Sequence, residues 1–281
     1  MTPRRPFGCD GVPVAVIGQG SWQTDRDPSA AVAALRRGVE LGLDHVDTAE
    51  IYGSGAAEEL VGQALAGLRE RVFLVSKFDP AHGTRQGTAR ACEASLKRLR
   101  TDWLDAYLLH WVGPHPLEET VAALEDLVRA GKILRWGVSN FDEIKLEAAL
   151  VIAGAGRIAC NQVLYHLGER AIEHAVLPFC ARHGIAVVGY SPFAAGAFPG
   201  VDTPQGRVLE RIGAAYGASP RQVALAFLTR WAGTFTIPKA VSLPHVEDNA
   251  AAARIGLNPD DIADIEAAFP LGPRRWGVPM P

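Results

Sequence analysis

Four ionisable side chains stand at or just beyond the ends of short apolar stretches in the first half of the sequence. Asp47 ends the stretch in HVDTA, Lys77 ends the one in FLVSKF, and His110 ends the one in YLLHW. Tyr52 follows five residues after Asp47. Any one of these alone would most often be a capping, solvated or structural residue. The same placement on three successive stretches indicates a shared site.

These residue types suit proton transfer to an oxygen atom. A phenol with an ordinary pKa of about 10 is a poor proton donor at neutral pH. A nearby Lys77 ammonium would stabilise the Tyr52 phenolate and lower that pKa, and a carboxylate such as Asp47 would keep the lysine charged and oriented. His110 could orient a carbonyl oxygen or relay a proton. Because no side chain supplies a hydride, the set predicts carbonyl reduction with a bound cofactor.

Buried parallel strands are the elements that would position these residues. The apolar stretches are nearly continuous rather than alternating, which is typical of strands buried on both faces. Strands are expected over residues 14–18, 45–49, 72–78, 104–110, 134–139, 158–164, 186–190 and 235–238. Helices are expected between and after them, over residues 29–41, 58–68, 84–99, 117–130, 143–153, 172–183, 220–231 and 246–253.

This alternation predicts an α/β fold, a (β/α)8 TIM barrel, with an open doubly wound sheet as the alternative. A single domain over residues 1–281 fits the size of such a barrel. The turn sequence GCDG at residues 8–11 predicts an N-terminal β-hairpin that caps one barrel end. A short C-terminal tail follows Phe269. Barrel active sites lie at the C-terminal ends of the strands, where the four ionisable residues are expected.

Composition narrows the classes of partner and compartment. The formal net charge is -3 and no long basic or acidic run is present, so neither nucleic acid nor a membrane surface is an expected partner. No apolar stretch approaches a spanning helix, and the N-terminus lacks the apolar core of a signal peptide. The four cysteines are scattered, without metal-ligand spacing. A cytoplasmic protein without a metal site is expected.

A series of short motifs resembles the aldo-keto reductase family. The motifs are GSW at residues 20–22, DTAEIY at 47–52, VSKF at 75–78, LLHW at 108–111, GVSNF at 137–141, NQVLYH at 161–166, YSPF at 190–193, IPKA at 237–240 and HVEDN at 245–249. They occur in the family's order from about residue 14 to residue 269. The size and short tail look like those of small bacterial members that reduce aldehydes such as methylglyoxal.

The resemblance implies a catalytic tetrad of Asp47, Tyr52, Lys77 and His110, in which Tyr52 is the general acid during reduction. It also implies an extended nicotinamide cofactor, with the carboxamide held by Ser139, Asn140 and Gln162 and the ring stacked on Tyr190. The pyrophosphate path would be lined by residues 191–193, and the adenosine end by residues 239–249. The remaining implied cofactor contacts are Gly20, Ser21, Ser191, Pro192, Phe193, Lys239, Ala240, Ser242, His245, Asp248 and Asn249.

The adenosine segment departs from the family pattern. Ala240 stands where many relatives have Ser, and His245 stands nearest to where many have an Arg that pairs with the 2′-phosphate. Lys239 still offers a positive charge, so NADPH is favoured, while NADH or use of both stays open. Trp22 and Trp111 would form an aromatic wall for a small carbonyl substrate, with a pocket left open by the short tail. A monomer is expected by the same resemblance.

Three other functions are compatible with parts of the pattern. A cofactor-binding regulatory or redox-sensing barrel with little turnover is the main alternative, and the intact tetrad argues against it. A Schiff-base aldolase would use Lys77 as an uncharged amine, which an Asp47 partner disfavours. A metal-dependent hydrolase would need several His and Asp residues at strand ends, and only His110 fits.

Overall fold

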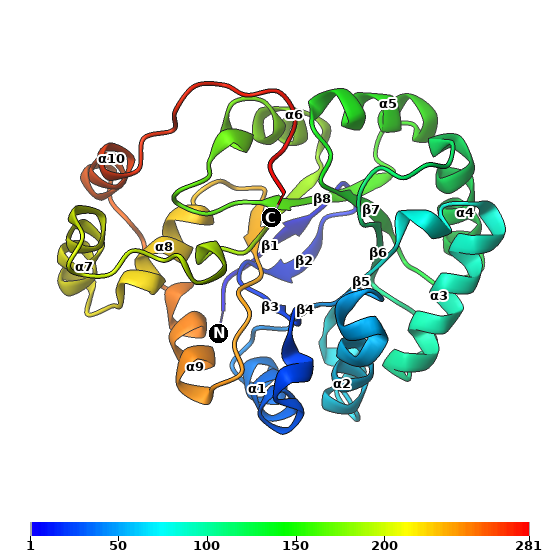
Figure 1. The fold of residues 1–281 in the computed structure, drawn as a ribbon, viewed down its shortest axis with the longest axis horizontal. Helices are drawn as coiled ribbons and strands as arrows, with labels where there is room; N and C mark the ends of the chain where they lie inside the picture. The colour runs from blue at the N-terminus through cyan, green and yellow to red at the C-terminus, as the bar shows by residue number, and fades with distance from the viewer. Residues whose placement is uncertain (1, 281) are drawn as a thin grey trace.

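Eight parallel strands in chain order form the centre of the molecule in residues 2–280, which the computed structural model describes. Met1 and Pro281, the ends of the predicted domain, lie outside the described residues. The strands are β3 (Gln19–Gly20), β4 (His45–Asp47), β5 (Phe73–Phe78), β6 (Ala106–Leu109), β7 (Trp136–Ser139), β8 (Ile158–Leu164), β9 (Ala186–Tyr190) and β10 (Thr234–Thr236). A parallel bridge between Ile17 and Thr236 joins the first and last strands, so the sheet closes into the predicted barrel (Figure 1).

Helices surround the strands, as Figure 1 shows. They are α1 (Pro28–Glu40), α2 (Ala56–Ala64), α3 (Arg85–Leu99), α4 (Leu117–Arg129), α5 (Glu143–Ala153), α6 (Val176–His183), α7 (Pro204–Tyr216), α8 (Pro220–Leu228), α9 (Leu243–Ala252) and α10 (Pro259–Ala268). Asp27, Thr84 and Asp142 each accept a hydrogen bond from a backbone N–H of the helix that follows. Within residues 2–280, no helix is both long and apolar enough to cross a membrane.

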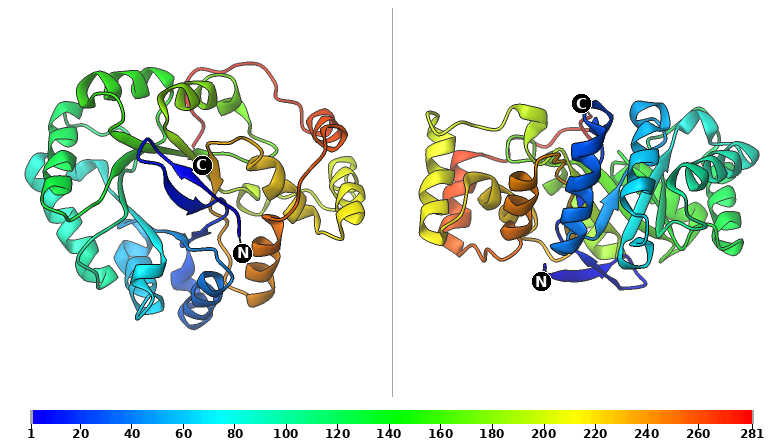
Figure 2. Two further views of the ribbon diagram at one scale, coloured as in Figure 1. Left: turned by 180° about the vertical axis from the view of Figure 1, so that it is seen from behind. Right: turned by 90° about the horizontal axis from the view of Figure 1, so that it is seen from below.

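The N-terminal hairpin covers one end of the barrel. Strands β1 (Arg4–Phe7) and β2 (Val12–Ala15) pair antiparallel, and the turn between them is the predicted one at residues 8–11. Phe7 is buried between Phe73 and Phe235, with ring centroids 4.8 and 5.0 Å away. Figure 2 shows the hairpin on the face opposite the end of the C-terminal tail. The predicted cap is therefore present, and the site can form only at the opposite mouth.

The strand expected over residues 14–18 was placed wrongly. Residues 14–15 belong to β2 of the hairpin, and the first barrel strand, β3, comprises Gln19 and Gly20. Val14, Val16 and Ile17 are all buried, because the chain runs from the hairpin beneath the barrel into β3. An apolar run looks the same in both locations, so hydrophobicity alone did not separate the hairpin from the barrel strand.

Candidate active site

The ammonium of Lys77 is the centre of a polar cluster at the C-terminal ends of the strands. Lys77 lies on β5 and is fully buried. Its Nζ donates to Oδ1 of Asp47 at 2.6 Å and to the carbonyl of Thr48 at 2.8 Å, and it lies 3.3 Å from the hydroxyl of Tyr52. Asp47 ends β4, and Tyr52 begins the 3-10 turn η2 (Tyr52–Gly55) after it. Adjacent parallel strands thus bring three of the four ionisable residues together.

Electrostatics keep this lysine charged. Burial alone would lower the pKa of Lys77, but the Asp47 carboxylate and the Tyr52 hydroxyl outweigh burial and raise that pKa above its ordinary value. The second oxygen of Asp47 accepts a hydrogen bond from Nε2 of Gln162 at 2.8 Å. A charged Lys77 is not the free amine that the aldolase alternative requires.

The net pKa of Tyr52 is raised above its ordinary value, although Lys77 lowers it as predicted. Burial is the largest influence and raises the pKa of Tyr52; the charge of Lys77 opposes burial, and that of Asp47 adds to it. This is because burial destabilises the Tyr52 phenolate more than the Lys77 ammonium stabilises it. Tyr52 therefore keeps its proton at neutral pH and is available as a donor.

His110 follows β6 and faces Tyr52. The two rings are 5.8 Å apart between centroids and meet edge-on, and the indole of Trp111 lies 4.8 Å from the imidazole. Burial and then the charge of Lys77 lower the pKa of His110 to about 3. Its Nδ1 is buried without a hydrogen-bond partner among residues 2–280. At neutral pH the ring is a neutral imidazole that can donate one hydrogen bond and accept another.

A chain of side-chain hydrogen bonds extends from the cluster across β7, β8 and β9. Ser139 Oγ donates to the carbonyl of Gln162 at 2.8 Å. Asn140 Nδ2 donates to the carbonyl of His110 at 3.0 Å, and its Oδ1 accepts from the hydroxyl of Tyr190 at 2.9 Å. Asn140 has a φ of 62°, a left-handed backbone that costs energy outside glycine and is common at functional sites. The amide-bearing residues of the predicted nicotinamide end thus lie together beside the cluster.

The residues predicted for the pyrophosphate lie around the connection that follows β9. Ser191 has a left-handed φ of 52°, Pro192 is buried, and Phe193 packs against the same apolar cluster as Ala240. On the other side, Gly20 N donates to the carbonyl of Pro238 at 3.1 Å. A Cβ at Gly20 would lie 2.9 Å from the carbonyl oxygen of Ile237, so only glycine fits there.

The predicted adenosine segment runs from β10 into α9. Lys239 and His245 are exposed, and Ser242 precedes α9 without capping it through its side chain. Asn249 is buried. Asp248 is held within the protein, since Oδ1 accepts from Gln222 Nε2 at 2.8 Å and Oδ2 accepts from Ser219 Oγ at 3.0 Å. These bonds tie α9 to the start of α8 and occupy the carboxylate that was predicted to contact the cofactor.

The site has features that fit an extended nicotinamide cofactor. Ser21 Oγ is fully buried and has no hydrogen-bond partner among the described residues, as is also true of His110 Nδ1. Buried polar atoms are nearly always satisfied, so such atoms at a barrel mouth indicate a ligand that completes them. The glycine at position 20 and the left-handed residues 140 and 191 lie along the same rim.

The predicted substrate residues lie at the rim as well. Trp22 directly follows Ser21 and has 46% of its surface exposed, and Trp111 is half-buried against His110. The C-terminal tail is anchored nearby: the carbonyl of Gly272 lies 3.0 Å from Nε2 of His174, and the side chain of Arg274 pairs with Glu143 at 2.6 Å. Figure 1 shows the tail running past α6 and back toward the barrel axis.

Two buried residues that support the cluster were missed by the sequence analysis. Glu58, on α2, accepts from Ser76 Oγ at 2.5 Å and from Arg98 Nε at 2.6 Å, beside Lys77 on β5. Asn161 Nδ2 donates to the carbonyl of Phe141 at 2.8 Å and so fixes the turn after β7. An asparagine inside a predicted buried strand was a visible signal, since Asn is depleted in strands. The burial of Glu58 had no comparable signal.

Known proteins resemble this chain in sequence and in fold. Residues 16–269 match the aldo/keto reductase family. The chain is 46% identical over 272 residues to the methylglyoxal reductase YeaE of Escherichia coli K12, covering 96% of each chain, and 35% identical to an aldo-keto reductase of Mycobacterium sp. JLS, covering 94% of each. The crystal structure of an aldo/keto reductase from Klebsiella pneumoniae in complex with NADP and acetate superposes with a TM-score of 0.92 at 44% identity, covering 100% of both chains. The chain belongs to the aldo/keto reductase family.

Proposed function

We propose that this protein reduces small aldehydes and ketones to alcohols with NADPH, and that Tyr52 is the proton donor. One observation carries the proposal: the buried Lys77 ammonium lies within hydrogen-bonding distance of both Asp47 and Tyr52 at the barrel mouth. The similarity to a methylglyoxal reductase of Escherichia coli supports small carbonyl compounds as the substrate class.

The tetrad donates the proton that the reaction needs and stabilises the group that loses it. Bound NADPH would supply a hydride to the carbonyl carbon, and the oxygen then needs a proton. Tyr52 donates that proton as the oxygen gains negative charge. The ammonium of Lys77 stabilises the phenolate that remains, and Asp47 keeps the ammonium in place. His110, as a neutral imidazole, orients the carbonyl oxygen by a hydrogen bond.

Other residues hold the cofactor in this proposal. Ser139, Asn140 and Gln162 bind the carboxamide, because their amides and hydroxyl offer both donors and acceptors, and Tyr190 stacks on the ring. The remaining contacts are Gly20, Ser21, Ser191, Pro192, Phe193, Lys239, Ala240, Ser242, His245, Asp248 and Asn249. The NADP in the Klebsiella relative supports NADPH over NADH.

The substrate pocket would be walled by Trp22 and Trp111, whose indoles suit a small carbonyl compound with a modest apolar tail. In the same proposal the protein is a monomer, forms one domain over residues 1–281 and needs no metal. It acts in the cytoplasm: all four cysteines are free in the part of the chain that the structure describes, which suits a reducing compartment.

The test is the loss of reduced nicotinamide absorbance with methylglyoxal and with an activated aromatic aldehyde, with NADPH and NADH assayed in parallel. Turnover with both aldehydes and a higher kcat/KM with NADPH are expected. Tight NADPH binding without turnover would instead support a regulatory or redox-sensing barrel. If neither nucleotide binds, the proposal is wrong.

A further inference from the structure

Arg221 stands at the start of α8 with its guanidinium in contact with two aromatic rings. Its central carbon is 5.3 Å from the ring centroid of Phe193 and 5.6 Å from that of Phe198, and these two rings meet edge-on 5.6 Å apart. Cation–π contacts of this kind hold a guanidinium in place while its N–H donors stay free for other partners. Arg221 is exposed, so those donors are open to a ligand.

Hydrogen bonds place this arginine between the two segments proposed for the pyrophosphate and the adenosine. Phe193 belongs to the segment that follows β9. Ser219, two residues before Arg221, and Gln222, the residue after it, both donate to the carboxylate of Asp248 on α9. The first turn of α8 is therefore fixed against α9, and Arg221 lies where both segments meet.

The charge of Arg221 is not paired within the described part of the chain. Among residues 2–280, no carboxylate lies within ion-pairing distance of its guanidinium, whereas Arg170 and Arg230 of the same half-barrel both pair with Glu173. The adenosine segment itself is short of cations, because Lys239 is the only lysine or arginine in residues 239–249. Arg221 would add a second cation beside Lys239 for an anionic group bound at this segment.

We infer that Arg221 binds the 2′-phosphate of the adenosine and is a determinant of the preference for NADPH over NADH. This inference rests on the proposed function. The 2′-phosphate is the one group that distinguishes the two nucleotides, and a planar guanidinium can bind a phosphate through two parallel hydrogen bonds. Arg221 thereby supplies the planar cation that His245 does not.

Calorimetric titration of the full-length protein tests this without turnover. NADPH, NADH, 2′,5′-ADP and 5′-ADP would be titrated into the wild type, Arg221→Ala, Arg221→Lys and the control Arg254→Ala. Arg254 is likewise exposed and free of ion pairs in the described structure, but follows the far end of α9. In Arg221→Ala the Kd for NADPH and 2′,5′-ADP should rise about tenfold or more, with NADH and 5′-ADP changed by less than about twofold. Arg221→Lys should be intermediate and Arg254→Ala unchanged.

Two results would overturn the inference while leaving the proposed function intact. Equal weakening of NADPH and NADH in Arg221→Ala would assign the arginine to the shared pyrophosphate or adenine. Unchanged binding of all four nucleotides would remove it from the site. Wild-type protein that binds no nucleotide would overturn the inference and the proposed function together. Unchanged thermal unfolding of each variant excludes a folding defect as the cause of weaker binding.

Discussion

The Asp47–Lys77 pair keeps a positive charge buried beside Tyr52. An ammonium with no exposed surface is costly unless its donors are satisfied. Lys77 donates to the Asp47 carboxylate, to the carbonyl of Thr48 and toward the Tyr52 hydroxyl, and Gln162 completes the coordination of Asp47. The positive charge of Lys77 is therefore stable and lies next to the Tyr52 hydroxyl, whose ionised form it can stabilise.

Replacement of Asp47 by Asn should move the alkaline limit of activity to lower pH. Without the carboxylate, burial dominates and the pKa of Lys77 falls, so the ammonium is lost as the pH rises through that lower value. The alkaline limb of the kcat/KM profile should shift down by about 1 to 3 pH units. Asp44→Asn is the matched control, since Asp44 pairs with Arg4 away from the site. An unchanged limb in Asp47→Asn would show that Lys77 does not depend on this carboxylate.

At the scale of residues, the sequence predicted the side chains that cluster around Lys77 and missed their surroundings. Asp47, Lys77 and His110 were found because strand ends in a barrel converge. The lowering of the Tyr52 pKa by Lys77 was predicted, but the larger opposing effect of burial was not, because burial depends on loops that arrive from elsewhere in the chain. Glu58 was missed for the same reason, since its partners Ser76 and Arg98 are distant in sequence.

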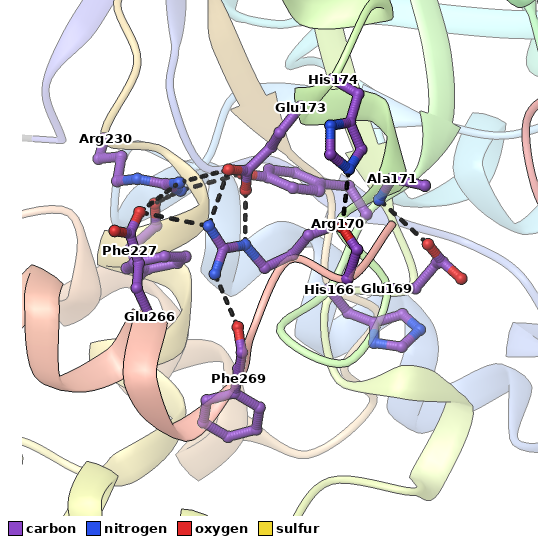
Figure 3. A network of polar contacts seen from close by, with 12 residues as sticks. His166, Glu169, Arg170, Ala171, Glu173, His174, Phe227, Arg230, Glu266 and Phe269 are labelled. Carbon is purple, nitrogen blue, oxygen red and sulfur yellow. Dashed lines mark hydrogen bonds and ion pairs between the residues drawn. The ribbon is translucent and has the colours of Figure 1, made fainter. Parts of the chain in front are cut away.

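Among the elements, a buried network of ion pairs joins α8, α10 and the segment after β8 (Figure 3). Glu173 pairs with Arg170 and Arg230, both at 2.8 Å, and it also accepts from the hydroxyl of Tyr165 at 2.7 Å. Arg170 NH1 donates to the carbonyl of Phe269 at the end of α10. The tail begins at this point, so the network fixes where it starts.

Replacement of Glu173 by Gln should destabilise the protein strongly. It leaves two nearly buried guanidinium groups with only Glu266, whose side chain is 46% exposed, as a carboxylate partner, and breaking a buried pair costs about 3–5 kcal/mol. The free energy of unfolding in urea measures the loss. Asp264→Asn, on α10, is the control: Arg211 and Asp264 have 61% and 49% of their side chains exposed, so this change should cost less than about 1 kcal/mol. Equal effects of the two substitutions would contradict a structural role for the network.

Apart from the first strand, the expected elements of the barrel were found, while two helices outside the ring were not predicted. Helices α7 and α10 lie side by side at the outer edge in both Figure 1 and Figure 2. Both begin with proline after a capping residue, Thr203 for α7 and Asn258 for α10. Those local signals were present in the sequence. The alternation of eight strands and eight helices is complete without α7 and α10, so the pattern did not require them.

At the scale of the whole molecule, the fold was predictable because a closed parallel sheet leaves a distinct sequence pattern. Its strands are buried on both faces, so they read as continuous apolar runs. The contact that closes the sheet was not readable from sequence, since it joins Ile17 to Thr236 across most of the chain. The hairpin was predicted from its turn, and it completes the core beneath the barrel through Phe7.

His45 in that core should make stability depend on pH. Burial and then the charge of Lys77 lower its pKa to about 3, whereas an unfolded histidine titrates near 6.5. The stabilising contribution is therefore complete above about pH 6.5 and is lost as the pH falls, by about 1.4 kcal/mol per pH unit. His110 behaves in the same way.

The free energy of unfolding in urea at about pH 7 and about pH 5.5 measures this loss. His45→Leu removes one of the two groups, so its stability should fall less steeply over this interval than that of the wild type. An identical slope in the two proteins would show that His45 is protonated in the folded state as readily as in the unfolded chain. His110→Asn provides the parallel comparison at the barrel mouth.

The most direct test of the central claim is a single-turnover measurement on Tyr52→Phe with methylglyoxal, combined with calorimetric binding of NADPH. Phenylalanine keeps the ring against His110 and removes only the hydroxyl near Lys77. If Tyr52 is the proton donor, the rate should fall by about 10²- to 10⁴-fold while the Kd for NADPH stays within about twofold of the wild-type value. A variant that binds NADPH and reduces methylglyoxal at close to the wild-type rate would contradict it.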